Sequence, residues 1–139
     1  MSTTPFIFGE GVSPTLPFTL HEHIIEDRGS RYSVSYGLAL GRDDIKAFLK
    51  TLKQPKHYQK ADHHSFAARI AHAGAIYETK SDDGETGAGM VILRIMQKRD
   101  VRNCVIVVTR WFGGTKLEGD RFKHIQDAAI YAVGQMTTK

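Results

Sequence analysis

Two glycine-containing polar segments carry the residues whose types and spacing could do chemistry. The first, residues 81–89 (SDDGETGAG), combines three carboxylates with three glycines. Backbone N–H groups at Gly87 and Gly89 could contact an anion at the positive end of a following helix. The carboxylates would repel that anion and favour a structural turn in which they cap the helix, so both interpretations stay open. The candidate binding residues of this segment are Asp82, Asp83, Gly84, Glu85 and Gly87.

The second segment, residues 109–117 (TRWFGGTKL), places a cation beside two aromatic side chains. Such a group can stack on nucleic-acid bases or on another side chain, and Lys116 adds a charge suited to phosphate. Alternatively, the two aromatic residues close the core while Arg110 pairs with a carboxylate of residues 81–89. The candidate residues here, together with two charged residues just downstream, are Arg110, Trp111, Phe112, Gly113, Gly114, Lys116, Asp120 and Arg121.

Metal and catalytic chemistry have less support in the sequence. Three histidines lie within residues 57–64, but their spacing fits no standard zinc motif, and the adjacent His63 and His64 would point to opposite faces of a strand. The single cysteine, Cys104, lies in an apolar run, and no serine stands in a nucleophile elbow. We therefore expect no metal site, no cofactor and no enzymatic activity.

The charge balance permits an anionic partner without requiring one. The chain has 19 Lys and Arg residues against 15 Asp and Glu residues, which gives a formal net charge of +4. Eight of the basic residues and three of the acidic ones lie between Arg94 and Lys123. A solvated helix face is the usual role of such charges, and an RNA- or ribosome-binding module is the alternative function that they leave open.

The elements that position these residues belong to one domain. The chain has 139 residues, which fits a prior of roughly 100 to 200 residues per domain. Residues 1–18 hold three of the four prolines and are expected to form an irregular N-terminal arm, with residues 19–139 as the single domain. No run of about 18 apolar residues is present, and a lone cysteine suits a reducing compartment. We therefore expect a cytoplasmic protein with no membrane contact.

Hydrophobic periodicity predicts a sheet with helices packed on it. The first two strands should form a hairpin with Gly29 at its turn. The continuous apolar run from Cys104 to Val108 is typical of a strand buried on both faces. Their order predicts an α+β fold with a mixed sheet. Strands are predicted at residues 19–25, 31–40, 64–71, 75–80 and 104–108, and helices at residues 43–52, 89–96 and 122–136.

Three motifs in this order resemble the IMPACT family: SDDGETGAG, NCVIVVTRWFGGTKL and GDRFKHI. The resemblance covers roughly residues 25–135 and passes through KADHHSFAARI. Because of Trp111 and residues 120–125, the chain is more similar to the eukaryotic branch than to the glycine-rich bacterial version. The resemblance implies a fold like that of ribosomal protein S5 domain 2, a two-layer α/β sandwich.

The resemblance also implies a function. Eukaryotic members regulate translation: they bind the large activator of the general amino-acid-control kinase and prevent the kinase from phosphorylating its initiation factor. Some members also bind actin. They place an RWD domain ahead of this one, and the 24 residues before the match are too few to hold it. By this resemblance the chain is expected to be a non-enzymatic regulatory module of the stress response that acts through protein–protein contacts.

On this basis we expect the two polar segments to form one partner-binding surface. Asp83 or Glu85 would anchor Arg110, and the glycines would let the two segments approach closely. Replacing Arg110 with Ala is then expected to abolish partner binding with little effect on the fold.

Overall fold

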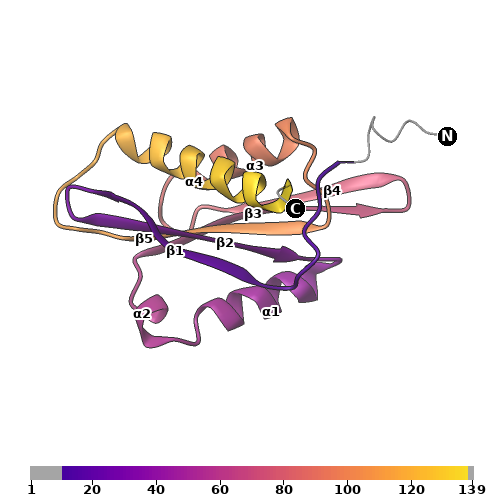
Figure 1. Cartoon of the computed structure of the whole chain (residues 1–139), viewed down its shortest axis with the longest axis horizontal. Coiled ribbons are helices and arrows are strands. Elements are labelled where there is room, and N and C mark those ends of the chain that lie inside the picture. Colours follow the sequence, from indigo (N-terminus) through magenta and orange to yellow (C-terminus); the bar gives the residue numbers. More distant parts are fainter. Residues whose placement is uncertain (1–10, 138–139) are drawn as a thin grey trace.

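The computed structural model describes residues 11–137, in which every predicted strand and helix is present (Figure 1). The strands are β1 (Thr19–Asp27), β2 (Ser30–Leu38), β3 (His63–His72), β4 (Ala75–Ser81) and β5 (Cys104–Trp111). The helices are α1 (Arg42–Leu52), α2 (Lys56–Gln59), α3 (Ala88–Lys98) and α4 (Asp120–Thr137). Only α2 was not predicted, because a single helical turn is too short to show a period.

The expected N-terminal arm, residues 1–18, is described only from Gly11 onward. Val12 forms an isolated bridge with Val101, and the carbonyl of Leu16 accepts a hydrogen bond from the backbone N–H of Leu38 at 2.9 Å. The first named strand begins at Thr19. Within the described part of the chain, no helix is both long and apolar enough to cross a membrane.

The five strands form one sheet in the order β1-β2-β5-β3-β4. Every pairing between these strands is antiparallel, so the predicted mixed sheet is wrong. The α+β class with helices on the sheet is confirmed. The error arose because a continuous apolar run indicates that a strand is covered on both faces, whereas it carries no information about the direction of the neighbouring strands.

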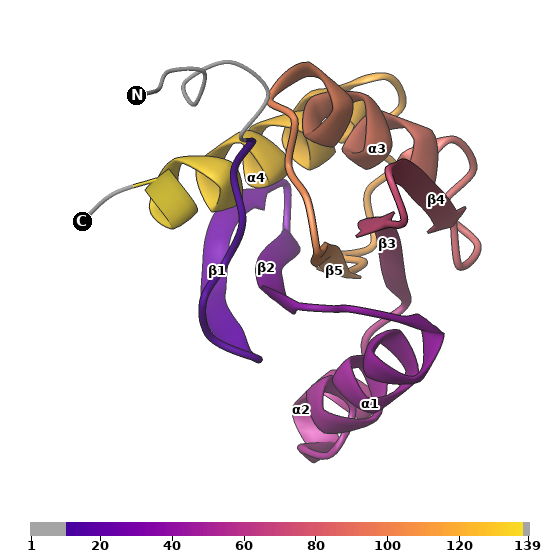
Figure 2. The same ribbon diagram turned by 90° about the vertical axis from the view of Figure 1, so that its right-hand side faces the viewer.

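Helices cover both faces of the sheet, so the molecule has three layers and the expected two-layer sandwich is wrong (Figures 1 and 2). Helices α3 and α4 lie on one face, and α1 and α2 lie on the other. Side chains of β5 alternate between two cores: Ile106 and Val108 pack with α3 and α4, while Val105 and Val107 pack with α1 and α2. This alternation explains why β5 is apolar at consecutive positions.

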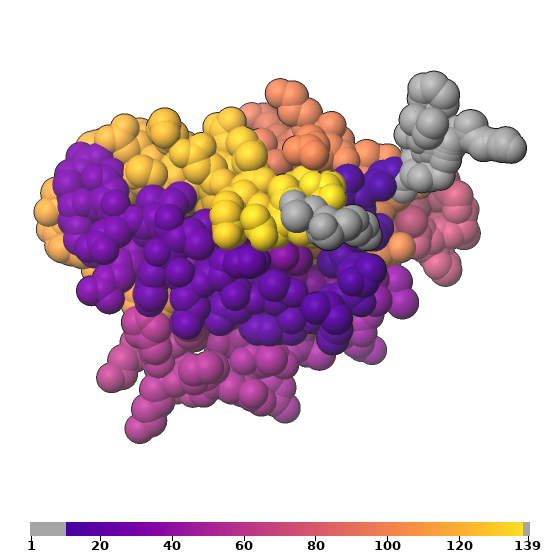
Figure 3. Space-filling model, viewed as in Figure 1, coloured from indigo at the N-terminus to yellow at the C-terminus, as the bar shows by residue number. Residues whose placement is uncertain are grey.

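The outer surface shows the same arrangement. In Figure 3, α4 (yellow to orange) lies directly against the N-terminal hairpin of β1 and β2 (indigo), and the segment containing α1 and α2 (magenta) projects from the opposite side. The core under α4 contains the aromatic Tyr32 and Tyr36 of β2 together with Ala128, Ala129 and Ala132 of the helix. Small helix residues let α4 approach these large strand side chains closely.

One end of the sheet gathers the start of β3, the end of β5 and the start of β2. Arg110 of β5 is in register with Tyr32 on one side and with His63 on the other. The loops that lead into α3 and α4 lie at this same end. A Cβ added to Gly87, just before α3, would lie only 3.1 Å from the ring of Phe122 in α4. The first turns of the two helices therefore meet above this end of the sheet.

Candidate functional site

A buried ion pair joins the two glycine-containing segments. Arg110 Nη1 donates to Glu85 Oε2 at 2.5 Å, and the two side chains are only 6% and 2% exposed. Arg110 Nη2 also donates to Ser30 Oγ at 3.2 Å, and the guanidinium lies 5.5 Å from the centre of the Tyr32 ring. The hypothesis that a carboxylate of residues 81–89 anchors Arg110 is confirmed, and Glu85 is that carboxylate.

The burial of this pair contradicts the assumption behind the Arg110→Ala expectation. Removing one partner of a buried pair leaves the other charge without compensation in a desolvated place, which typically costs about 3–5 kcal/mol. Arg110 is therefore a structural residue, and its loss is expected to weaken the fold. Binding experiments need variants at more exposed positions of the site.

Asp82 and Asp83 also serve the local structure. The Asp82 carboxylate accepts hydrogen bonds from the backbone N–H groups of Gly87 at 3.0 Å and Gly89 at 2.8 Å, and these bonds lower its pKa. Asp83 Oδ2 accepts a bond from the backbone N–H of His64 at 2.8 Å. The anion position that the sequence suggested at the start of α3 is thus filled by the chain's own Asp82, as the capping interpretation predicted.

Trp111 does not lie on the same surface as Arg110. Consecutive residues of a strand point to opposite faces, and Trp111 lies on the face of α1 and α2. Its ring stacks on His57 with centroids 4.4 Å apart, and its Nε1 donates to the carbonyl of His57 at 2.9 Å. The expected single surface is therefore split by β5, with Trp111 on one side and Arg110 on the other.

The glycines after β5 allow a different close approach from the one expected. A Cβ on Gly113 would lie 2.0 Å from the carbonyl carbon of Gly29, in the turn between β1 and β2. Gly113 therefore packs against this hairpin turn rather than against residues 81–89. Gly114 has a φ of 92° and open space around it, so it permits the backbone conformation of the loop. Gly84, with a φ of 87°, lies beside the His63 ring.

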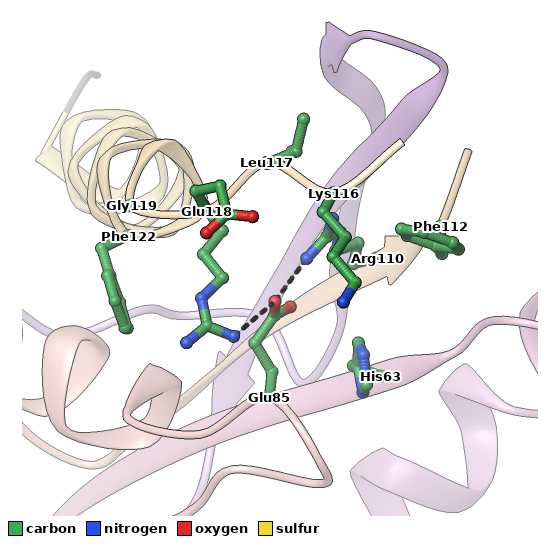
Figure 4. Close-up of a pocket in the computed structure, with 10 residues that line it drawn as sticks. His63, Glu85, Arg110, Phe112, Lys116, Leu117, Glu118, Gly119 and Phe122 are labelled. Atoms are coloured by element: carbon green, nitrogen blue, oxygen red, sulfur yellow. Dashed lines mark hydrogen bonds and ion pairs between the residues drawn. The ribbon is translucent and has the colours of Figure 1, made fainter. Parts of the chain in front are cut away.

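Above the ion pair lies an open cleft of about 580 Å³ (Figure 4). Three predicted residues outside the ion pair line it: Phe112, Lys116 and Arg121. Asp120 does not, because its carboxylate turns away and pairs with Arg28 at 2.5 Å. The complete lining is His63, Glu85, Arg110, Phe112, Lys116, Leu117, Glu118, Gly119, Arg121 and Phe122.

Five lining residues were not among the sequence-based candidates. His63 was assessed as a metal ligand, although its register beside Arg110 is what brings it to the cleft. Phe122 was considered as the first residue of the last predicted helix, residues 122–136. The sequence could have indicated the remaining three residues, because they lie in the loop between the candidates Lys116 and Asp120. These three are Leu117, Glu118 and Gly119.

The three histidines of residues 57–64 lie in three different environments. His64 is buried, its Nε2 donates to the carbonyl of Tyr58 at 2.8 Å, and its Nδ1 accepts from the Thr109 hydroxyl at 2.9 Å. Burial lowers the pKa of His64, so its ring is neutral near pH 7. His63 Nδ1 donates to the carbonyl of Asp83 at 2.9 Å, which leaves Nε2 available to another group. His57 stacks on Trp111 on the opposite face of the sheet.

The cleft combines positive charge with aromatic walls. Its lining carries the cations Arg110, Arg121 and Lys116 against the carboxylates Glu85 and Glu118. Glu85 is shared, because Arg121 Nη1 also lies 3.9 Å from its Oε2. The first turns of α3 and α4 meet near the cleft, but Asp82 and Asp120 offset the positive ends of their dipoles, so the cleft's positive charge comes from its side chains. The arrangement can therefore receive a small anionic group that has an apolar neighbour.

By its fold and its site, the molecule is an α+β domain in which two glycine-containing loops converge on a buried Glu–Arg pair. The Impact N-terminal domain matches residues 28–133, a range that contains both loops and the whole lining of the cleft. The chain therefore belongs to the Impact N-terminal domain family. The family membership expected from the sequence motifs is confirmed.

Named relatives come from eukaryotes, in agreement with the expected branch. The protein called Protein IMPACT homolog of Saccharomyces cerevisiae is 40% identical over 111 residues, which are 78% of this chain and 43% of that protein. Protein IMPACT-B of Xenopus tropicalis is 36% identical over 116 residues, which are 82% of this chain and 37% of that protein. The chain thus spans less than half the length of these curated relatives.

Two solved structures share the fold. One, described as a hypothetical protein, has a TM-score of 0.76 and 26% sequence identity, and the match covers 93% of this chain and 62% of that chain. The other is described as the two-domain translational regulator Yih1. It has a TM-score of 0.59 and 37% identity, and the match covers 88% of this chain and 48% of that chain.

Proposed function

We propose that this chain is a non-enzymatic regulatory module of translational control that acts in the cytoplasm through protein–protein contacts. Its family membership and its likeness to a solved structure described as a translational regulator support this role. The proposed partners are the general amino-acid-control kinase or the activator of that kinase, with actin as a further partner. The proposed effect is inhibition of the phosphorylation of the initiation factor.

The observation that carries the proposal is the cleft inside the matched range. It offers exposed contact groups over a rigid base: Phe112 is 47% exposed, and Lys116 is exposed beside it. The base is held by the buried pair of Glu85 and Arg110. Aromatic residues, including Phe, are enriched at protein interfaces relative to the rest of the surface.

An RNA- or ribosome-binding role is the second candidate, favoured by the excess of basic residues between Arg94 and Lys123. Apart from Arg110, which lies within β5, the structure divides these residues into two groups, one before β5 and one after it. Strand β5 has 8 residues, so its ends lie about 25 Å apart. Arg102 in the first group is also paired with Asp100 at 2.9 Å. Because the basic residues are divided in this way, they support RNA binding less well than the cleft supports protein binding.

An affinity experiment tests the proposed function. Tagged protein is incubated with a eukaryotic lysate, with and without nuclease, and the retained proteins are identified. The test variant carries Phe112→Ser and Lys116→Glu, both at exposed positions. The control carries Lys98→Glu, an exposed change at the far end of α3.

We expect the kinase, its activator or actin to be retained by the wild type and the control after nuclease treatment and lost by the test variant. Retention of ribosomal proteins and RNA that disappears with nuclease would instead favour the second candidate. If all three proteins retain the same partners, the cleft is not the contact surface. Circular dichroism of each variant checks that the fold is intact.

A further inference from the structure

Two cations at the mouth of the cleft have no close carboxylate partner of their own among the described residues: Lys116 pairs with none, and Arg121 has only a long contact with the shared Glu85. Lys116 is exposed and makes no hydrogen bond or ion pair with any described residue. Arg121 is 31% exposed, and its nearest carboxylate oxygen is Glu85 Oε2 at 3.9 Å. That oxygen already accepts the 2.5 Å bond from Arg110. Both outer cations can therefore take a further anionic partner without breaking an existing strong contact.

Apolar walls stand next to these cations. The Phe112 side chain is about half exposed, with the Arg110 guanidinium 5.7 Å from the centre of its ring. The Phe122 ring lies 4.6 Å from the Arg121 guanidinium. Figure 4 shows the two phenyl rings at opposite sides of the cleft, with Lys116 reaching across the opening between them. A ligand that fills this space meets a cation and a ring together.

The surroundings of the cleft select against a long polyanion. Glu118 is part of the lining, and the carboxylate of Asp62 is bonded to a lining residue, since its Oδ2 accepts a bond from the backbone N–H of Phe112 at 2.7 Å. A nucleic-acid strand needs a groove of cations that follows successive phosphates, and these carboxylates interrupt such a path.

We propose that the cleft binds a short acidic segment of a partner protein, with a carboxylate of that segment between Lys116 and Arg121 and an apolar side chain against Phe112. This inference rests on the proposed function and specifies the chemistry of the partner. The carboxylate meets two charge-assisted donors, and the apolar side chain covers the exposed ring. His63 Nε2, at the floor of the cleft, supplies a further polar contact.

A titration with matched peptides tests this inference on the purified chain. The probes are the acetylated and amidated tripeptides Glu-Phe-Glu and Gln-Phe-Gln, which have nearly the same shape and differ in charge. A uridine trinucleotide and inorganic phosphate are the third and fourth probes. Binding is followed by backbone amide chemical shifts, which locate each probe and give its dissociation constant.

We expect Glu-Phe-Glu to shift the amides of residues 112–122 and of His63, and Gln-Phe-Gln to bind at least fivefold more weakly. Lys116→Gln and Arg121→Gln should each weaken Glu-Phe-Glu binding about threefold to tenfold. The matched controls Lys98→Gln and Arg99→Gln, at exposed positions near the end of α3, should leave it unchanged. Phe112→Ser should weaken both peptides, because it removes the apolar contact and not the charge.

Four results would overturn the inference, and the first three are equal binding of the two peptides, no shift in these residues at millimolar Glu-Phe-Glu, and tighter binding of the trinucleotide at the same residues. Phosphate that binds as tightly as Glu-Phe-Glu would also overturn it, since the apolar contact would then contribute nothing. Failure here and failure of the proposed function are distinguishable. Suppose that Phe112→Ser loses the partners retained from lysate, whereas Lys116→Gln retains them as the wild type does. The proposed function then stands, and the proposed acidic segment is excluded.

Discussion

Arg110 and Glu85 form the base of the cleft, although their buried side chains offer little surface for contact. Their side chains are almost fully buried, and the guanidinium connects Glu85 to Ser30 and to the Tyr32 ring. Such a pair fixes the positions of two loops that are distant in sequence. The more exposed Lys116, Arg121 and Phe112 line the cleft above the pair, and they are the residues that we propose for contact with a partner.

We expect Arg110→Ala to destabilise the protein by about 3–5 kcal/mol, because it leaves the Glu85 carboxylate buried without a counter-charge. Urea unfolding followed by circular dichroism measures this loss. Arg121→Ala is the matched control: its side chain is partly exposed and its contact with Glu85 is long, so the loss should be below about 1 kcal/mol. Equal losses for the two variants would contradict the structural role of Arg110.

His64 is expected to make stability depend on pH. Burial lowers the pKa of His64 below its unfolded value, so the unfolded chain binds a proton more readily than the folded one. Stability from this residue is therefore complete above a pH of about 6.5 and falls as the pH drops below it. We expect a lower urea midpoint at pH 5.5 than at pH 8.

The His64→Gln variant should lose part of this difference, whatever its stability at pH 8. His72→Gln, at an exposed position of the same strand, serves as the control and should keep the wild-type difference. An unchanged pH dependence in His64→Gln would assign the effect to another group.

At the scale of elements, the start of α3 depends on a carboxylate from outside the helix. Asp82 accepts bonds from the N–H groups of Gly87 and Gly89, and Gly87 adopts a φ of 90° that glycine tolerates best. The sequence predicted this helix, and it offered capping by the preceding carboxylates as one of two interpretations of the segment. It did not indicate which carboxylate caps the helix and which one pairs with Arg110, because that choice depends on how the loop folds over β5.

We expect Asp82→Ala to destabilise the protein by about 1–2 kcal/mol through the loss of this cap, as judged by urea unfolding. The lowered pKa of Asp82 means that its contribution is present above the unfolded pKa of about 3.9 and is lost as the pH falls through the folded value. Glu118→Ala removes an exposed carboxylate nearby and should have little effect. A similar loss from both substitutions would argue against the cap.

Element prediction from the sequence was accurate for type and position, and it failed for relative arrangement. Periodicity and turn residues placed each of the five strands and the three longer helices. The antiparallel direction of β5 and the position of α1 on the opposite face could not be read from local pattern, because both depend on how segments cross the sheet. For the same reason Trp111 was grouped with Arg110, although the strand separates them.

At the scale of the whole molecule, two cores share a single central strand. Cys104 at the start of β5 has 0% exposure and packs in the core under α3 and α4. Burial raises the pKa of its thiol, and the thiolate is the reactive form. The only cysteine of the chain therefore reports on opening of the core that contains it.

We expect the thiol of Cys104 to react with a disulfide reagent orders of magnitude more slowly in the native protein than in 6 M guanidinium chloride at the same pH. The rate in low denaturant should rise in parallel with global unfolding. A fast reaction in native buffer would mean that the core opens locally, without unfolding of the whole domain.

The stacking of Trp111 on His57 has a consequence for optical measurements. Trp111 is the only tryptophan of the chain, and its ring lies on the face of the sheet opposite the cleft. The tryptophan emission therefore records events around α2. A ligand in the cleft should change this emission only if its binding moves β5. If a ligand shifts the amide resonances of the cleft and leaves the tryptophan emission unchanged, then β5 does not move on binding and the two faces of the sheet respond independently.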